Sequence, residues 1–286
     1  MSVLEREIYH AMTRENIIAA AIAISKGRCG GTFLIVDQTG KVPGSYTELM
    51  EAINVARYKV GYPRESDNIN YDDNHQATVI MLPGDYSAEG RIAFSAKNLH
   101  IIGLGLPGTD TGVTIRPEDP SSFAFGGSGT GIELANFAIA VDSAVMALYW
   151  ELMDGNCWFH DLMIMGDSTN ATHGIYTGGV KASVIENNRI SGFVTSGITL
   201  AGGDDMYFYD GVIKNNQIGA TATCAKGIYV ASGVTCHNGL IEGNKLIGDN
   251  FTKTIDIDAT AADVMTVANY LHAAGEGGTS RGDVST

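Results

Sequence analysis

The chain has 286 residues, of which 18 are Lys or Arg and 32 are Asp or Glu, so its formal net charge is −14. This acidic balance argues against the basic surface that proteins use to bind nucleic-acid phosphates, and no nucleic-acid partner is expected. Hydrophobic residues make up 44% of the chain, which is enough for a core and excludes a disordered protein. The 36 glycines, against only 17% charged residues, favour a β-rich fold with many turns over a helical bundle.

Residues 1–31 are predicted to form an N-terminal helical arm. Ser2 and Glu5 have the spacing of a capping box, and apolar residues follow at helical spacing. The arm either packs on its own domain or docks on a partner subunit, and both alternatives remain open. The interface residues expected in the second case are Leu4, Ile8 and Met12.

The longest apolar run of the chain, residues 17–24, is too short for a membrane span, which needs about 20 residues. Acidic residues occupy the place where a secretory signal peptide is basic, so neither a membrane segment nor a signal peptide is expected. The cysteines show no CxxC spacing and no pairing with histidines, so we expect reduced thiols, no metal site and no cofactor. They are Cys29, Cys157, Cys224 and Cys236.

Residues 32–76 are predicted to contain a short strand, a helix and a loop. The strand is expected at residues 32–37, and the helix is expected to open at Ser45, which forms a second capping box with Glu48. We interpret this helix as a cap on the first turn of the domain that follows. The acidic loop at residues 62–76 lacks the alternating ligand spacing of a calcium-binding loop.

Residues 77–271 contain a repeat in which a short strand carries an Asn or Asp next to an apolar residue. The repeat recurs at intervals of 25 to 28 residues, and the segments Val184–Ile190, Val212–Ile218 and Leu240–Leu246 are near copies. The recurring polar residues, which we expect to form one structural ladder, are Asn136, Asp161, Asn188, Asn216, Asn244 and Asn269. A repeat of this length, with two or three strands in each unit, predicts stacked coils that bury their apolar residues against one another.

The physical basis of such a ladder is the bend between two strands. Asn tolerates the left-handed conformation that a sharp bend requires. Asparagines in successive coils would lie about 4.8 Å apart, close enough for their amides to hydrogen-bond one another. The alternation within each unit then directs the flanking apolar residues into the core.

The chain resembles the right-handed parallel β-helix superfamily of the pectate-lyase type. The resemblance depends on the repeated units at residues 187–190 and 215–218, and on the entry segments Tyr46–Ile53 and Val79–Tyr86. Leu82 stands where the family has valine before Pro-Gly. The match covers residues 32–271 and implies an all-β solenoid of about six to seven coils with a capping helix. The superfamily includes lyases, hydrolases, tailspikes and structural virion proteins, so it does not fix the activity.

Polysaccharide cleavage would need two carboxylates that flank the scissile bond. The candidates, weak ones, are Asp204, Asp205 and Asp210. They resemble the paired aspartates of polygalacturonases, but the other motifs of that family are missing. The arginines follow no pectate-lyase pattern, and His160, His173 and His237 form no motif for a triad or a metal, so we expect no catalysis.

Sugar binding without cleavage is a further possibility, because aromatic side chains on a β-helix can hold a glycan. The aromatic residues considered are Tyr149, Trp150, Trp158, Tyr176, Tyr207 and Tyr209. Packing in the core or against another subunit explains their positions equally well.

These observations together predict a bacteriophage virion protein, made in the bacterial cytoplasm, that decorates and cements the exterior of the capsid. The resemblance to phage β-helices implies a homotrimer whose partner is the major capsid protein. A short ladder, a helical arm and a Gly-rich tail at residues 272–286 are typical of an assembly protein. The alternative is a tailspike-like protein of the virion that binds or degrades polysaccharide.

Overall fold

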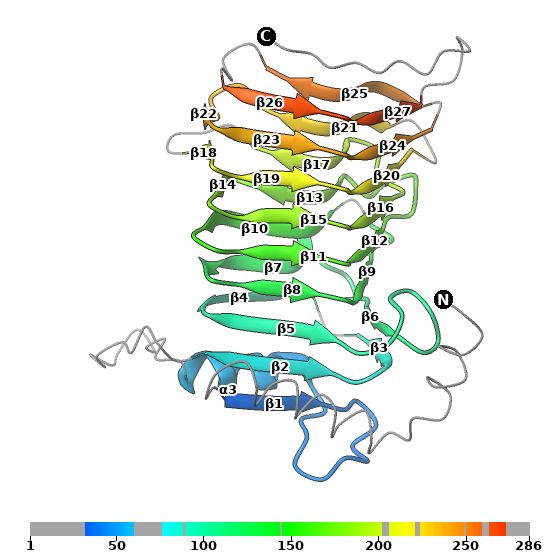
Figure 1. Ribbon diagram of the computed structural model, residues 1–286. Helices are drawn as coiled ribbons and strands as arrows, with labels where there is room; N and C mark the ends of the chain where they lie inside the picture. Colours follow the sequence, from blue (N-terminus) through cyan, green and yellow to red (C-terminus); the bar gives the residue numbers. More distant parts are fainter. Residues whose placement is uncertain are drawn as a thin grey trace, which may run out of the picture.

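The computed structural model describes residues 32–59, 76–87, 90–143, 145–201, 206–220, 224–248, 250–258 and 263–272. These residues form an all-β parallel solenoid of about six turns, with strands of incomplete turns at both ends and very little helix (Figure 1). The predicted arm, with Leu4, Ile8 and Met12, lies outside the described residues, as do Asp204, Asp205 and the Gly-rich tail. The described helix is too short and too polar to cross a membrane.

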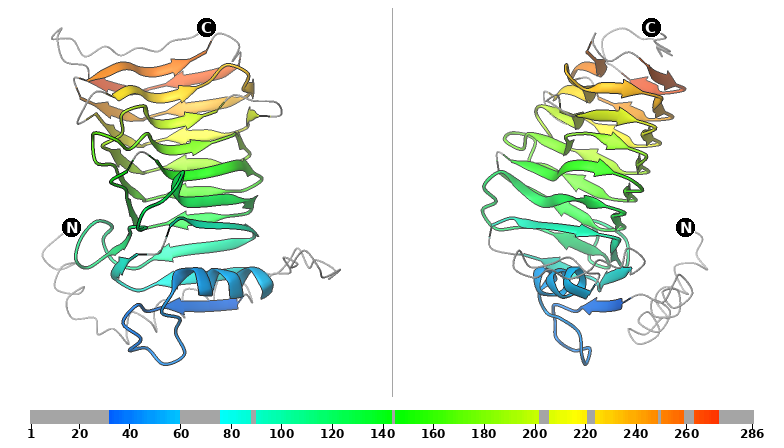
Figure 2. Two further views of the ribbon diagram at one scale, coloured as in Figure 1. Left: turned by 180° about the vertical axis from the view of Figure 1, so that it is seen from behind. Right: turned by 90° about the vertical axis from the view of Figure 1, so that its left-hand side faces the viewer.

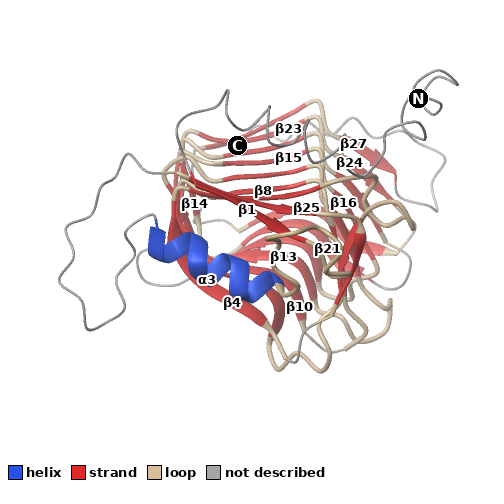
Figure 3. Cartoon of the chain, turned by 90° about the horizontal axis from the view of Figure 1, so that it is seen from below, coloured by secondary structure: helices blue, strands red, loops and turns tan. Residues whose placement is uncertain are grey.

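Three parallel sheets surround the core, and we call them sheets A, B and C (Figure 3). Sheet A contains β1 (Thr32–Val36), β2 (Ala77–Met81), β5 (Leu99–Gly103), β8 (Glu133–Ala135), β11 (Trp158–His160), β15 (Val184–Glu186), β19 (Val212–Lys214), β23 (Gly239–Glu242) and β26 (Val264–Val267). Sheet B contains β3 (Gly84–Tyr86), β6 (Val113–Ile115), β9 (Ala138–Ala140), β12 (Met163–Met165), β16 (Arg189–Ser191), β20 (Gln217–Gly219), β24 (Lys245–Ile247) and β27 (Tyr270–His272).

Sheet C has the longest strands and takes up the rest of each turn. It contains β4 (Ile92–Lys97), β7 (Phe123–Thr130), β10 (Met146–Asp154), β13 (His173–Thr177), β14 (Val180–Lys181), β17 (Ser196–Leu200), β18 (Tyr207–Tyr209), β21 (Cys224–Val230), β22 (Thr235–His237) and β25 (Phe251–Ile257). Successive turns repeat this order, so a residue lies beside its counterpart one turn away (Figure 1).

The core is a set of columns of identical or similar apolar residues. Ile185, Ile213 and Ile241 are register partners on neighbouring strands of sheet A, and all three are fully buried. Aromatic residues fill the wider turns near β10, where the Trp150 ring lies 5.5 Å from Phe94 and 5.4 Å from Phe159, edge to face. Parallel strands that place apolar residues in register bury apolar area along the whole stack.

Four buried asparagines form a hydrogen-bonded ladder at the bend between sheets A and B. The Nδ2 of Asn188 donates to Asn216 Oδ1 (2.9 Å) and to the carbonyl of Phe159 (3.0 Å), and the backbone N–H of Asn188 also donates to Asn216 Oδ1 (3.0 Å). Asn216 repeats this pattern with Asn244, and Asn244 repeats it with Asn269. The ladder therefore satisfies polar groups that the bend would otherwise leave buried and unpaired.

Asn136 and Asp161 do not belong to this buried ladder. They have φ angles of 59° and 53°, and their counterparts in later turns are the exposed, left-handed Asn187 (57°) and Asn215 (55°). The buried position comes one residue later and is occupied by apolar residues in these turns, Phe137 and Leu162. The single predicted ladder is therefore two adjacent ones, because the left-handed bend and the buried amide both favour asparagine.

The helix α3 (Leu49–Lys59) lies beside β1 at one end of the solenoid (Figure 2). It buries Leu49, Ala52, Ile53 and Ala56 and packs against β1, β2 and β4. The predicted start at Ser45 was wrong, since the Ser45 hydroxyl donates instead to the carbonyl of Val42 (2.7 Å) in a turn and the helix begins four residues later. That α3 acts as a cap stays a prediction.

Replacing Asn216 by Ala tests the contribution of the ladder to stability. The substitution removes the acceptor of two buried N–H groups of Asn188 and the donor to the carbonyl of Ile185. We expect the free energy of unfolding in urea to fall by about 3 kcal/mol. The matched control, Asn215→Gly, keeps the left-handed bend and should change stability by less than about 0.5 kcal/mol. Equal losses in the two variants would contradict this role.

Candidate functional site

The outward face of sheet A carries an unbroken column of apolar side chains, which we call the apolar column. Its members are register partners on five successive strands, Trp158, Val184, Val212, Leu240 and Met265. Trp158 is 38% exposed and Met265 60% exposed, whereas the three aliphatic residues between them are half-buried. A continuous apolar strip on a flat sheet is typical of a surface that contacts another macromolecule.

Trp158 is held in place by neighbours from its own sheet. Its ring stacks on His160, with centroids 3.8 Å apart, and its Nε1–H donates to a carboxylate oxygen of Glu186 at 2.7 Å. Glu186 also forms an ion pair with Lys214 at 2.9 Å. The indole is therefore already ordered and loses little side-chain entropy on contact with a partner.

Beside Trp158, four titratable groups form a hydrogen-bonded chain across β5, β8 and β11, which we call the histidine–carboxylate chain. Glu133 binds His100 Nδ1 through one oxygen and His160 Nε2 (3.0 Å) through the other. The second nitrogen of His160 binds Asp161 at 2.7 Å. Solenoid stacking places these residues together, because His100, Glu133 and Trp158 are register partners.

Burial opposes the ionisation of Glu133 and His160 in the histidine–carboxylate chain, but their hydrogen bonds outweigh the effect of burial. Desolvation raises the pKa of Glu133, yet its bonds to His100 and His160 lower the pKa to about 2. Desolvation lowers the pKa of His160, but the carboxylates of Glu133 and Asp161 raise it above its usual value. The arrangement holds protons and charge beside the apolar column. The described residues contain no group of His, Cys, Asp and Glu that suits a metal ion.

Sequence reasoning treated His160 as an isolated histidine and did not predict the histidine–carboxylate chain. The signal that could have found it is spacing, since His100, Glu133 and His160 lie one solenoid turn apart in succession.

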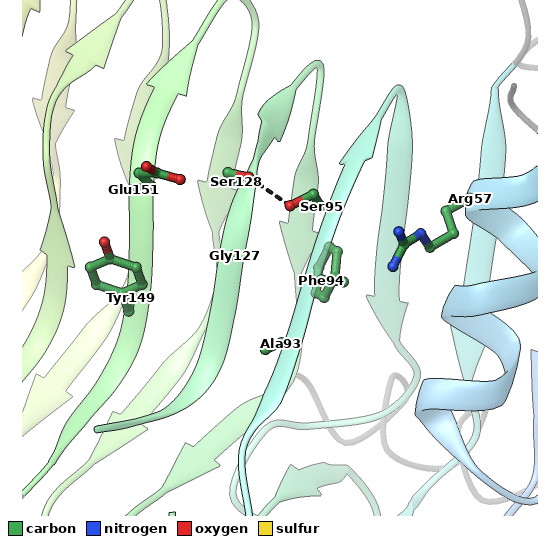
Figure 4. A pocket seen from close by; sticks show the side chains of 8 residues that line it. All are labelled: Arg57, Ala93, Phe94, Ser95, Gly127, Ser128, Tyr149 and Glu151. Carbon is green, nitrogen blue, oxygen red and sulfur yellow. Dashed lines mark hydrogen bonds between the residues drawn. The ribbon is translucent and has the colours of Figure 1, made fainter. Parts of the chain in front are cut away.

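A second candidate is a groove on sheet C, the sheet C groove, with a volume of about 330 Å³ (Figure 4). It is lined by Arg57, Ala93, Phe94, Ser95, Gly127, Ser128, Tyr149 and Glu151. Arg57 comes from α3, the two serines from β4 and β7, and Tyr149 and Glu151 from β10, so four elements build it. The hydroxyls of Ser95 and Ser128 share a hydrogen bond of 2.7 Å between the two ends.

Small residues keep the floor of this groove open. Gly127 lines the groove in register with Phe94, and a Cβ atom at Gly127 would fall 1.7 Å from the carbonyl oxygen of Phe94. Glycine is therefore required where β4 and β7 approach each other. The floor presents backbone and two hydroxyls to whatever occupies the groove.

Tyr149 supplies an aromatic wall. Its ring stacks between Phe123 (5.0 Å) and Tyr176 (6.0 Å) along the solenoid axis. Burial, with the nearby carboxylate of Glu151, raises the pKa of Tyr149, so its hydroxyl stays protonated and able to donate. An aromatic wall, hydroxyl groups and an exposed carboxylate are the features of a site for a polar, hydroxylated ligand.

Sheet C also holds a buried cluster of His173, Ser196 and Thr199. The Ser196 hydroxyl lies 2.8 Å from His173 Nδ1 and hydrogen-bonds Thr199. Burial lowers the pKa of His173 to about 4, so its imidazole is neutral at pH 7. Ser196 has no exposed surface, and a serine closed to solvent does not attack a substrate, so the cluster is structural.

Of the three carboxylate candidates, only Asp210 lies among the described residues. Asp210 is exposed at a left-handed turn and accepts a hydrogen bond from Asn238 at 3.1 Å. Tyr207 and Tyr209 pair with each other, with rings 5.0 Å apart, and Trp150 is fully buried in the core. Of the residues considered for sugar contact, Tyr149 lines the sheet C groove, and Tyr176 stacks on it.

The described cysteines Cys157, Cys224 and Cys236 are free thiols. Burial raises the pKa of each, to about 11 for Cys224 and Cys236. They remain protonated at neutral pH and are poor nucleophiles.

Comparison with known proteins supports the fold class and goes no further. No protein-family model matches the chain, and no curated protein matches it. Among solved structures, the crystal structure of Escherichia coli YbhC is similar, with a TM-score of 0.54 and 13% sequence identity over 85% of this chain and 72% of that one. The geometry and this likeness define the class as a parallel β-solenoid.

The histidine–carboxylate chain makes stability depend on pH. A raised His160 pKa adds stability that is complete below about pH 6.5 and is lost as the pH rises through the folded-state pKa. The lowered Glu133 pKa adds stability above about pH 4.5, which is lost as the pH falls towards about 2. Both contributions to stability are therefore present between about pH 4.5 and about pH 6.5.

We therefore expect His160→Gln to lower the free energy of unfolding more at about pH 5.5 than at about pH 9, measured by urea denaturation. The control is His237→Gln, which replaces an exposed histidine on β22. A loss for His160→Gln that is the same at both pH values would contradict the proposed charge on this imidazole.

Proposed function

We propose that this protein is a structural component of a bacteriophage particle, a homotrimer that binds the major capsid protein on the exterior of the capsid. The apolar column of sheet A is the observation that carries the proposal. Trp158 and Met265 are two of the four exposed large hydrophobic residues in the described chain, and both lie in this column. Exposing them in an isolated chain is unfavourable, and a subunit contact removes the cost.

The solenoid suits a cementing role because its sides are long and stiff. Its turns are joined by parallel ladders, and the amide ladder locks their register. A stiff surface with an ordered anchor such as Trp158 spends little free energy on conformational ordering when it binds. The proposal includes no catalytic step and no cofactor. Synthesis in the bacterial cytoplasm is part of the same proposal.

Counting copies of the protein per purified particle by quantitative mass spectrometry tests this function. A capsid-decorating trimer should be present in hundreds of copies, in fixed ratio to the major capsid protein. A count of a few tens or fewer would contradict decoration and favour a place in the tail. Absence from particles would overturn the virion assignment.

A second candidate function is glycan binding by a tailspike-like protein, which the sheet C groove favours. Its volume of about 330 Å³ is that of a small ligand site, and Tyr149 offers its ring edge and hydroxyl beside the hydroxyls of Ser95 and Ser128. Arg57 and Glu151 at the two ends give the groove groups of opposite charge. Cleavage of the glycan is not part of this candidate.

Tyr149→Ala tests the glycan candidate against a panel of soluble host-surface oligosaccharides, with binding followed by titration calorimetry. We expect affinity for any bound oligosaccharide to fall by about tenfold, or about 1.4 kcal/mol, because the aromatic wall and its hydroxyl donor are lost. Tyr209→Ala is the control, since Tyr209 lies on β18 outside the groove lining. No binding by the unchanged protein, or equal effects of both substitutions, would contradict the candidate.

A further inference from the structure

Sheets A and B meet along the asparagine bend (Figure 1), and next to this bend each sheet carries one column of outward side chains. On sheet A, the column next to the bend, which we call the charged column, contains His160, Glu186, Lys214, Glu242 and Val267. On sheet B, the facing column, which we call the sheet B column, contains Met163, Arg189, Gln217, Lys245 and Tyr270.

The two columns carry opposite charges in two of the three middle turns. Glu186 on β15 and Arg189 on β16 belong to one turn, and Glu242 on β23 and Lys245 on β24 belong to another. In the turn between them, Lys214 is matched by the uncharged Gln217. The sheet B column therefore has no like charge opposite any charge of these three turns.

Part of this charge is unsatisfied within the chain. Arg189 and Glu242 are exposed, and neither has an ion-pair partner among the described residues. Lys245 is also exposed, and its ammonium lies 5.9 Å from the ring of Tyr270. Exposed cations aligned in one column are unusual on a chain with a net charge of −14. The pattern fits a partner surface that bears carboxylates at the same spacing.

Outward apolar residues of sheets A and B are also matched within a turn. Trp158 lies in the turn that places Met163 on sheet B, and Met265 lies in the turn that places Tyr270 there. Met265 is 60% exposed and Tyr270 44% exposed. Methionine packs favourably against aromatic rings, so each of these two turns offers a sulfur on one sheet and a ring on the other.

We infer that sheet A of one copy packs against sheet B of a second copy, with parallel solenoid axes and with equal turns in contact. Rotation about an axis parallel to the solenoid keeps every copy at the same height, so Glu242 of one copy meets Lys245 of the next. Such a contact joins two different surfaces and closes into a ring. The inference rests on the proposed homotrimer and names the faces that form it.

Charge reversal tests the pairing. Glu242→Lys and Lys245→Glu should each raise the concentration at which the trimer dissociates by about tenfold, because like charges then meet at all three contacts. The double variant should restore the unchanged value to within about threefold. Mass and dissociation are measured by sedimentation velocity across a concentration series, and circular dichroism checks that each variant is folded.

Mixing the two single variants separates a contact between copies from an effect within one chain. In a mixed trimer, positions 242 and 245 carry opposite charges at two of the three contacts, so association should recover in part although neither chain carries both changes. The control pair is Asp154→Lys and Lys181→Glu, which reverses an ion pair of 3.3 Å on sheet C. Neither control substitution should change the mass.

The outcomes are distinct from those of the proposed function. A trimer insensitive to the single reversals, or a mixture that associates no better than the single variants, would overturn the pairing of sheets A and B alone. A monomeric or dimeric unchanged protein would overturn both the pairing and the homotrimer of the proposed function. Recovery in the mixture supports the pairing even if the protein is absent from phage particles. Hundreds of copies per particle support the function even if the pairing fails.

Discussion

In-register parallel stacking, held by buried amides, is the constraint on which the rest of the structure depends. Each turn offers its neighbour the same apolar residues, so no turn buries its core surface alone. The amide ladder from Asn188 to Asn269 satisfies the backbone at the bend and prevents slippage between turns. Because the register is fixed, outward side chains at equivalent positions of successive turns lie one strand spacing apart and form columns.

The candidate sites follow from this stacking. The apolar column, the histidine–carboxylate chain and the sheet C groove all join residues that are far apart in sequence and one turn apart in space. Ser95 and Ser128, for example, meet because their strands are neighbours. A solenoid thus builds surfaces from repetition, and small residues that interrupt a column, such as Gly127 beside Phe94, create its grooves. Assembly and ligand binding would use different sheets of the same stack.

The sequence predicted the parallel solenoid because Val184–Ile190 and its two near copies repeat the same pattern of buried and exposed positions. It misplaced Asn136 and Asp161, since a left-handed bend and a buried amide select the same residue type one position apart. It placed the start of α3 at Ser45, whose hydroxyl serves a turn instead. The sheet C groove was beyond prediction, because Arg57 reaches it from a helix whose position depends on tertiary packing.

A cryo-electron microscopy map of the assembled protein tests the central claim most directly, since it shows which faces of the solenoid touch another molecule. The account predicts sheets A and B buried at contacts between copies, with Trp158 covered and the sheet C groove open to solvent. A map in which the apolar column of sheet A faces solvent, while sheet C forms the contact between copies, would contradict it.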